Sequence, residues 1–486
     1  MPASRPAPSR ARRARRARRP VAVLCVVAAI PAALLGVLGW WAHGKADADT
    51  IPVDAPVDTA PLPEVMATPL MSLRRAPSLL AVDAQASLVR AAAQPLLDSI
   101  DGSSCAALSV DDVEVAAVNP DVAVIPASTL KVLVAAVALD VLGAGTTFTT
   151  QVTGAAPVGG VVQGDVYLIG GGDPVLSEAW YTVATETRKR PPMHATSVEA
   201  LADALVNAGV TRITGRLVAD ASRYDAEAYP PGWGDDLKKV ADGVPVGALV
   251  INDSISQDGV ISADPTAAAA RTFERILEAK GVTIDGGSTT GTAPAGSGVL
   301  ASVQSATLTD IVNEMLATSD NLTAEMLVKE IAHSAGAQGT RAAGLLAITA
   351  TLTEWGLPTT GLQLTDGSGL SRDNQLTCAL LLDVLQRSAA DDPLGAGLAR
   401  GGQDGSTLAD YFERDGLGGV LQGKTGSLTG VKSLGGYYVA SGEEVQFIVI
   451  LNGATADAFL SVWTDLGDTL LAANKGPTAD SLAPQP

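Results

Sequence analysis

Ser128 and Lys131 form the only Ser-x-x-Lys pattern in this chain, at the start of an apolar, alanine-rich run that predicts a helix over 128–142. Residues three positions apart share one face of a helix, so the Lys131 amine can lie beside the Ser128 hydroxyl. A serine hydroxyl is a poor nucleophile until a base takes its proton, and a lysine can do so only when burial or a second cation lowers its pKa. The pair therefore indicates acyl transfer through an activated serine, close to the free N–H groups of a helix N-terminus.

Two further patterns occur once each: Ser319-Asp320-Asn321, a Ser-x-Asn, and Lys424-Thr425-Gly426, a Lys-Thr-Gly. The first lies between two segments of helical periodicity, and the second precedes the strand-like end of the chain. Lys424 would be the second cation if the fold brings it close to Lys131. Alone, each of the three patterns has an ordinary explanation as a helix N-cap, a helix-end turn or a turn lysine. In this order, on these elements, they are far more specific.

The composition argues against several other classes of protein. The 486-residue chain is 47% hydrophobic and only 17% charged, which disfavours a disordered or coiled-coil protein. A net charge of −19 would repel phosphate backbones, so we expect no nucleic-acid partner. The three histidines stand far apart, which leaves little for a metal site or a Ser-His-Asp triad. We therefore expect neither a metal nor a cofactor.

The N-terminus predicts export. Residues 1–20 carry eight arginines and no acid, and the uncharged segment 21–42 is long enough to cross a bilayer as a helix. By the positive-inside rule, the basic segment stays cytoplasmic and the body of the chain lies outside. We interpret 21–42 as a single-pass anchor in the cell membrane, followed by a Pro- and Ala-rich stalk over 43–83. A cleaved signal peptide, cut near Ala46-Asp47-Ala48 to give a secreted form, stays open.

The exported chain has the pattern of an α/β domain split by an insertion, with the halves at 84–146 and 298–476 and a tail at 477–486. The insertion, 147–297, is rich in glycine turns and short strands, and two amphipathic helices interrupt it. Its predicted strands and helices include 161–169, 211–219, 197–208 and 265–280. The flanking halves predict strands at 106–110, 113–118, 433–440 and 445–451, and helices at 84–100, 308–317, 323–334, 341–355, 376–387 and 454–474.

With these three motifs in this order, the sequence resembles the serine penicillin-binding protein and β-lactamase superfamily. It is most similar to the penicillin-binding protein 4-like branch of D-Ala-D-Ala carboxypeptidases and endopeptidases, the S13 peptidases, over roughly residues 85 to 475. Other matching stretches are Gly170-Gly171-Gly172-Asp173-Pro174, Asp220-Ala221-Ser222-Arg223, Asp366-Gly367-Ser368-Gly369-Leu370-Ser371-Arg372 and Lys424-Thr425-Gly426-Ser427-Leu428. The resemblance implies a transpeptidase-like α/β (α+β) domain, an antiparallel sheet flanked by helices, split by a β-rich inserted subdomain.

The resemblance also implies a role for each motif residue. Ser128 would be the acylated nucleophile and Lys131 its general base. Ser319 would relay the proton to the leaving amine, and Asn321 would hold the substrate amide. Asp320 is expected to be structural or solvent-facing rather than catalytic.

Around the Lys-Thr-Gly motif, the resemblance implies that Lys424 supplies positive charge and Thr425 binds the terminal carboxylate, with Gly426 and Ser427 completing the substrate-binding strand. The backbone N–H groups of Ser128 and Ser427 would form the oxyanion hole. The implied activity is trimming of peptidoglycan stem peptides that end in D-Ala-D-Ala, with β-lactams as covalent inhibitors. D,D-endopeptidase activity is an open second activity.

Three other functions are compatible with parts of the sequence. Gly418 to Thr425 fits the spacing of a P-loop, but the glycines and β-type residues that follow predict no helix to hold a phosphate. A β-lactamase would use the same serine and lysine in a compact domain, against which the insertion of about 150 residues argues. A non-catalytic, anchored β-lactam or peptidoglycan sensor has no use for the complete set of motif residues. The last two stay open as alternatives.

Cys105 and Cys378 are the only cysteines in the exported part, since Cys25 falls in the apolar segment. An even pair of exported cysteines is more often bridged than free, so we expect a disulfide. Two small buried thiols are the competing interpretation. A bridge requires the two Cα atoms to come within about 7 Å.

Overall fold

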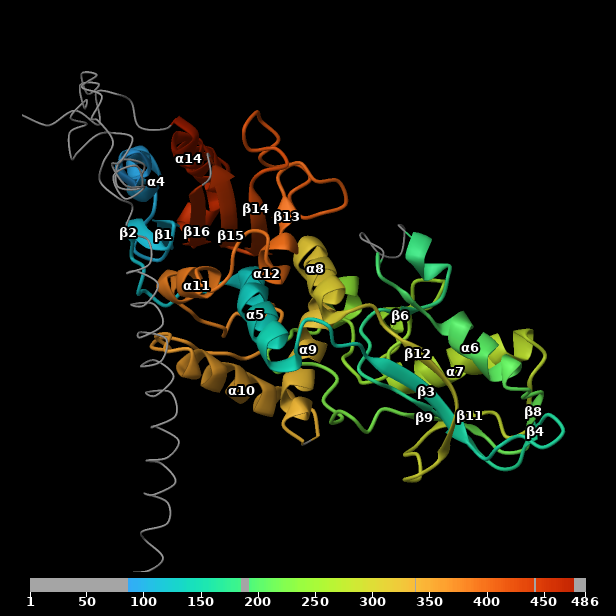
Figure 1. Ribbon diagram of the computed structural model, residues 1–486. Helices are drawn as coiled ribbons and strands as arrows, with labels where there is room; N and C mark the ends of the chain where they lie inside the picture. The colour runs from blue at the N-terminus through green and yellow to red at the C-terminus, as the bar shows by residue number, and fades with distance from the viewer. Residues whose placement is uncertain (1–85, 185–191, 337, 441–442, 476–486) are drawn as a thin grey trace, which may run out of the picture. The chain divides into compact units, whose positions relative to one another are not determined.

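The computed structural model describes residues 86–184, 192–336, 338–440 and 443–475 (Figure 1). The predicted basic segment, membrane anchor, stalk and C-terminal tail lie outside these ranges. Within them, no helix combines the length and the apolar character needed to span a bilayer.

A six-stranded sheet joins the two halves of the split domain, in the order β13-β14-β15-β16-β1-β2. The early hairpin β1–β2 adds to the last strand, β16, with Cys105 opposite Ile450, and every neighbouring pair is antiparallel. The strands are β1 (Cys105–Val110), β2 (Val113–Val118), β13 (Ala399–Arg400), β14 (Gln422–Leu428), β15 (Val431–Ala440) and β16 (Glu443–Asn452). Segments far apart in sequence therefore lie side by side in one sheet of a mixed α/β fold.

Helices cover both faces of this sheet, and the side chains of the central strands alternate between two cores. Ala106 and Leu108 pack with α4 and α14, whereas Cys105 and Ala107 pack with α5 and α8 to α11. The helices are α4 (Gln94–Asp98), α5 (Leu130–Leu142), α8 (Leu308–Thr318), α9 (Asn321–Ser334), α10 (Arg341–Glu354), α11 (Cys378–Leu385), α12 (Pro393–Ala396), α13 (Ala454–Asp457) and α14 (Phe459–Ala472). The single helix predicted over 454–474 is thus two, broken at Ala458.

The insertion contains strands in three small sheets and two helices with their own core. A five-stranded sheet runs β11-β9-β5-β3-β12, a three-stranded sheet runs β10-β8-β4, and β6 pairs with β7. The elements are β3 (Thr149–Gly154), β4 (Val161–Val162), β5 (Val166–Ile169), β6 (Leu176–Ser177), β7 (Thr196–Ser197), β8 (Arg212–Ile213), β9 (Leu217–Asp220), β10 (Thr283–Ile284), β11 (Ser288–Thr290), β12 (Gly298–Gln304), α6 (Val198–Asn207) and α7 (Pro265–Ala279).

The structure corrects two details of the predicted insertion. Strand β12 pairs with β3, so the return to the catalytic half falls after residue 304 rather than at 298. Each strand predicted over 161–169 and 211–219 is broken in two, because the chain crosses from one sheet to the other. Gly164 and Gly215 touch at the crossing, where a Cβ on Gly215 would lie 2.4 Å from the Gly164 carbonyl carbon.

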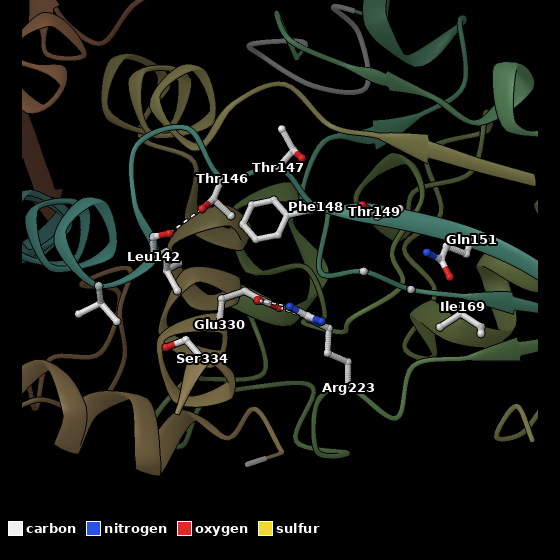
Figure 2. A pocket seen from close by; sticks show the side chains of 13 residues that line it. Leu142, Thr146, Thr147, Phe148, Thr149, Gln151, Ile169, Arg223, Glu330 and Ser334 are labelled. Atoms are coloured by element: carbon white, nitrogen blue, oxygen red, sulfur yellow. Dashed lines mark hydrogen bonds and ion pairs between the residues drawn. The ribbon is translucent and has the colours of Figure 1, made fainter. Parts of the chain in front are cut away.

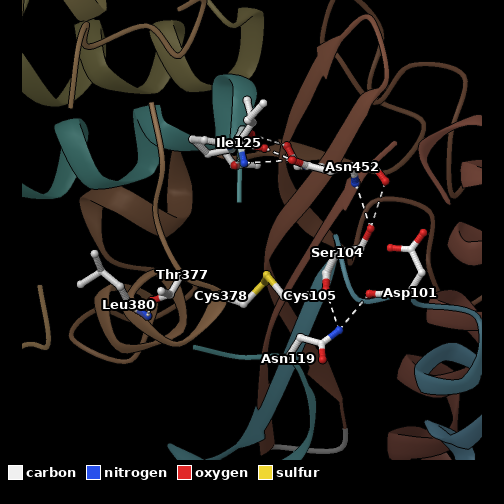
Figure 3. The surroundings of a disulfide bond; sticks show 12 residues. Asp101, Ser104, Cys105, Asn119, Ile125, Thr377, Cys378, Leu380 and Asn452 are labelled. Carbon is white, nitrogen blue, oxygen red and sulfur yellow. Dashed lines mark hydrogen bonds between the residues drawn. A yellow bond between two sulfur atoms is a disulfide. The ribbon is translucent and has the colours of Figure 1, made fainter. Parts of the chain in front are cut away.

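A disulfide joins Cys105 of β1 to Cys378 at the start of α11, with Cα atoms 6.0 Å apart (Figure 3). This is the pairing expected from the even number of exported cysteines. Both cysteines are fully buried, and the bond links residues 273 positions apart in sequence. It therefore ties the first strand of the domain to a helix that follows the insertion.

We expect that replacing both cysteines by alanine lowers the free energy of unfolding by about 2–4 kcal/mol, because the crosslink restricts the unfolded chain. Denaturant unfolding of wild type and the double variant measures this. Thiol counting in denaturant is the direct check: one thiol, Cys25, should react before reduction and three after it. Three reactive thiols before reduction would rule the bridge out.

Candidate active site

Ser128 lies in a 3₁₀ turn, η2 (Ala127–Thr129), that leads directly into α5. The predicted helix is present, but its first turn is tighter than the α-helical turn expected. Ala127 has a φ of +49°, in the left-handed region that is costly for a non-glycine residue. Such backbone strain is concentrated at functional sites, where the surrounding structure holds it in place.

The segment before Ser128 is fixed from two sides. The Asn452 side chain accepts from the Ile125 N–H at 3.0 Å and donates to the Ile125 carbonyl at 3.1 Å, as a strand partner would (Figure 3). The Pro126 carbonyl accepts hydrogen bonds from the hydroxyls of Thr129 and Ser433, both at 2.7 Å. The end of β16 and the first part of β15 thereby position the turn that carries Ser128.

Lys131 is fully buried, and its amine has three hydrogen-bond partners. It lies 3.0 Å from the Ser128 Oγ, 2.7 Å from the Asn321 Oδ1 and 2.5 Å from the Ser368 carbonyl oxygen. Two of these partners, the amide and peptide oxygens, can only accept. A neutral lysine must spend both of its N–H groups on them, which leaves its lone pair for the Ser128 hydroxyl.

Burial lowers the pKa of Lys131 to about 8, while the nearby carboxylates of Asp366 and Glu325 act in the opposite direction. We expected Lys424 to contribute as a second cation, but desolvation is the main cause of the shift. The low-dielectric surroundings penalise the ammonium form directly. A substantial fraction of Lys131 is therefore neutral near pH 8.

The Ser-x-Asn motif supplies a partner to each of two buried lysines. Ser319 ends α8 in the left-handed conformation, with φ of 64°, and its hydroxyl accepts from the fully buried Lys424 at 2.8 Å. Asp320 caps α9 by accepting from the Thr323 N–H, the structural role expected for it. The sharp turn between the helices thus directs Ser319 to Lys424 and Asn321 to Lys131.

Strand β14 brings the Lys-Thr-Gly motif against the nucleophile's turn. A Cβ on Gly426 would lie 3.0 Å from the Ser128 backbone nitrogen and 2.9 Å from the Pro126 carbonyl oxygen, so only glycine allows this approach. Thr425 and Ser427 flank Gly426, half-buried and exposed respectively. Lys424 and Thr425 lie within strand β14 and do not precede a helix, so the P-loop interpretation is excluded. The glycines and β-type residues after Thr425 had already argued against such a helix.

One edge of β14 has no strand partner beside Ser128 in the described part of the chain. β13 pairs only with Gln422 and Gly423, whereas β15 accompanies β14 along its whole length on the other side. An extended peptide could therefore add to the open edge from Lys424 onward.

The turn 366–369 was not among the predicted site residues, although residues 366–372 match the family that the sequence resembles. The Ser368 carbonyl accepts from Lys131, and Gly369 is required at φ +81°, where a Cβ would lie 2.0 Å from the Ala127 carbonyl oxygen. Nothing in the spacing connects this turn to Ser128, because some 240 residues separate them. Glu325 could have been found, since it lies four residues after Asn321 on the same helix face.

The insertion also contacts the site. The Asp242 carbonyl accepts from the Asn321 amide at 2.9 Å, and the buried Trp233 indole donates to Asp366 at 2.9 Å. Three ion pairs attach residues 223–227 of the insertion to helices α9 and α10. They are Arg223–Glu330, Asp225–Lys329 and Glu227–Arg341. The insertion thus contacts both Asn321 and the turn that begins at Asp366.

A separate cavity of about 480 Å³ lies where β3 and β5 meet α5 and α9 (Figure 2). Figure 2 shows Arg223 and Glu330 pointing toward each other in its lining, joined by two hydrogen bonds of 2.6 Å. None of the predicted site residues lines it. No cluster of three or more His, Cys, Asp or Glu suited to a metal occurs among the described residues.

Comparison with known proteins identifies the family of the chain. The model of the D-Ala-D-Ala carboxypeptidase 3 (S13) family matches residues 84–262 and 254–472. A D-alanyl-D-alanine carboxypeptidase of an Actinomadura species is 29% identical over 421 residues, 70% of this chain and 75% of the relative. A carboxypeptidase of Mycobacterium tuberculosis is 31% identical over 82% of this chain and 86% of its own.

Solved structures give the same fold. Penicillin-binding protein 4 of Haemophilus influenzae superposes with a TM-score of 0.62 at 22% identity, over 74% of this chain and 92% of that chain. A predatory peptidoglycan endopeptidase of Bdellovibrio bacteriovorus gives 0.51 at 18% identity, over 77% and 94%. The chain has a mixed α/β fold of the penicillin-binding protein type and belongs to the D-Ala-D-Ala carboxypeptidase 3 (S13) family of hydrolases.

Proposed function

We propose that this protein is a serine-type D-Ala-D-Ala carboxypeptidase that trims peptidoglycan stem peptides through an acyl-enzyme on Ser128. The observation that carries the proposal is the environment of Lys131. Its amine is buried, and two acceptor-only oxygens occupy its N–H groups, so its lone pair faces the Ser128 hydroxyl. An activated serine of this kind performs acyl transfer.

In the acylation step, the Ser128 Oγ attacks the carbonyl carbon of the penultimate D-Ala while Lys131 takes the hydroxyl proton. The resulting oxyanion lies between the backbone N–H groups of Ser128 and Ser427. When the tetrahedral intermediate collapses, the peptide C–N bond breaks, and the proton that Lys131 took is relayed through Ser319 to the leaving amine of the terminal D-Ala. Water then hydrolyses the ester, which releases the shortened peptide and restores Ser128.

Substrate binding would use the open edge of β14. The peptide adds there as an extended strand, its terminal carboxylate reaching Thr425 and the positive charge of Lys424, while Asn321 holds the scissile amide. β-Lactams would acylate the same serine. The uncharged segment 21–42 would hold this domain on the outer side of the cell membrane, where peptidoglycan lies, and D,D-endopeptidase activity on cross-linked peptides is a second proposed activity.

The pH dependence of acylation follows from the state of Lys131. Only the neutral amine can accept the Ser128 proton, and its pKa is lowered by burial to about 8. The acylation rate should therefore rise with pH, by about tenfold per unit well below pH 8, and level off above it. Stopped-flow measurement with a fluorescent penicillin between pH 6 and 9.5 checks this. A flat or falling rate between pH 6.5 and 8 would exclude Lys131 as the base.

One experiment separates the proposal from its alternatives. The protein is incubated first with a fluorescent penicillin and then, in a fresh sample, with a peptide ending in D-Ala-D-Ala. The carboxypeptidase becomes labelled and releases D-Ala. A sensor is labelled but releases no D-Ala, and a β-lactamase turns the drug over quickly without lasting label. Either of these last two results would overturn the proposed function.

A further inference from the structure

Glu325 lies directly behind the partners of Lys131. It sits on α9 one turn after Asn321 and is almost fully buried. Its carboxylate accepts from the Ser368 N–H at 2.7 Å and from the Gly367 N–H at 3.0 Å. One turn of one helix thus controls both acceptors of Lys131, the Asn321 amide directly and the Ser368 carbonyl through the backbone of residues 367–368.

Asp366, at the start of the same turn, is the second buried carboxylate. It accepts from four donors: the N–H groups of Gly369 and Ser371, the Asn374 amide and the Trp233 indole. The Gly369 N–H belongs to the same peptide group as the Ser368 carbonyl that accepts from Lys131. These four donors occupy both oxygens of Asp366, whereas the Oε2 of Glu325 has one donor, the Gly367 N–H at 3.1 Å.

The charges around this pair come from several elements. Lys131 faces it from α5, and Asp320 and Asp242 also act on that lysine. Arg341 of α10 donates to the Thr365 carbonyl and pairs with Glu227. Burial first, and the charge of Asp366 second, raise the pKa of Glu325 to about 7. A carboxylate that ionises just below the pH at which Lys131 loses its proton opposes that loss.

We propose that Glu325 is a positioning residue of the acylation step, which rests on the proposed function: its carboxylate holds the turn that presents the Ser368 carbonyl to Lys131, and its negative charge sets the pH at which Lys131 becomes a base. Among the described residues, Glu325 makes no hydrogen bond to Ser128, and it acts through Lys131 alone. Ser319, Asn321 and Lys424 belong to the sequence motifs and were predicted as site residues, whereas Glu325 was not.

The test is the pH profile of acylation by a fluorescent penicillin in Glu325→Gln. Glutamine keeps the oxygen that accepts from Ser368 but loses the charge, so the midpoint of the rising limb should move down by on the order of one pH unit. Glu325→Asp keeps the charge but is too short to hold both N–H groups, so its limb should stay near the wild-type pH while its rate falls. A purely structural role would lower the rate of Glu325→Gln and leave its midpoint unchanged, which would overturn the proposal.

Asp220→Asn is the matched control, because Asp220 is also a buried carboxylate that accepts from two backbone N–H groups, in the insertion. Its midpoint should equal that of wild type. If Glu325→Gln fails to fold, the ¹³Cε resonance of Lys131 in the wild type gives a second test. It should titrate in two steps, the lower one from Glu325, and a single step would contradict the proposal. A wild type that penicillin does not acylate would instead refute the proposed function itself.

Discussion

Ser128→Ala should release D-Ala from a D-Ala-D-Ala peptide at least about 10⁴-fold more slowly than the wild type, because removing the nucleophile of a serine hydrolase removes the covalent route entirely. Fold should be retained, since the half-buried hydroxyl makes only a long contact of 3.4 Å to the Ser368 carbonyl besides that with Lys131. D-Ala release is followed with a D-amino-acid oxidase assay, and thermal unfolding is measured alongside.

Ser461→Ala is the control for this substitution. Its hydroxyl is exposed on α14 and bonds only to the Ala458 carbonyl among the described residues, so activity should match that of the wild type. Residual D-Ala release by Ser128→Ala within tenfold of wild type would place the nucleophile elsewhere.

Lys131→Arg should lose acylation by penicillin by about 10²–10⁴-fold, the usual contribution of a general base. A guanidinium keeps the positive charge but does not deprotonate at working pH, and it is too large for a fully buried site built around a single amine. The second-order acylation constant is measured at pH 9, where wild-type Lys131 is mostly neutral because burial lowers its pKa to about 8.

Lys280→Arg, on the insertion, provides the comparison, because arginine can retain the ion pair with Asp203. It should acylate as the wild type does. If Lys131→Arg folds and acylates at near wild-type rate, another group takes the serine proton.

The sequence was informative wherever spacing along one element decides a contact. Ser128 and Lys131 meet because residues three apart share a helix face, and the strands predicted at 106–110 and 113–118 form the hairpin β1–β2. The cysteine pairing could be argued from export and parity. These inferences need only local periodicity and simple chemistry.

The remaining contacts depend on tertiary structure. The Ser368 carbonyl belongs to the backbone, so no pattern of side chains could predict its contact with Lys131. The turn that contains it also lies far from Lys131 in sequence. The main cause of the lowered Lys131 pKa is burial, which the motif alone could not separate from the charge of Lys424. The strands predicted at 161–169 and 211–219 are each broken where the chain passes from one sheet to another, and Gly164 and Gly215 are in contact there. Strand propensity depends on nearby residues in the sequence, so it cannot predict a contact between two separate segments.

The most direct test of the account is to identify the residue that penicillin acylates. The protein is incubated with benzylpenicillin, digested, and its peptides are mapped by tandem mass spectrometry. We expect one penicilloyl group per chain, on the peptide that contains Ser128 and on the Ser128 oxygen itself. A penicilloyl group on another residue, with the Ser128 peptide unmodified, would contradict the assignment of Ser128 as the nucleophile.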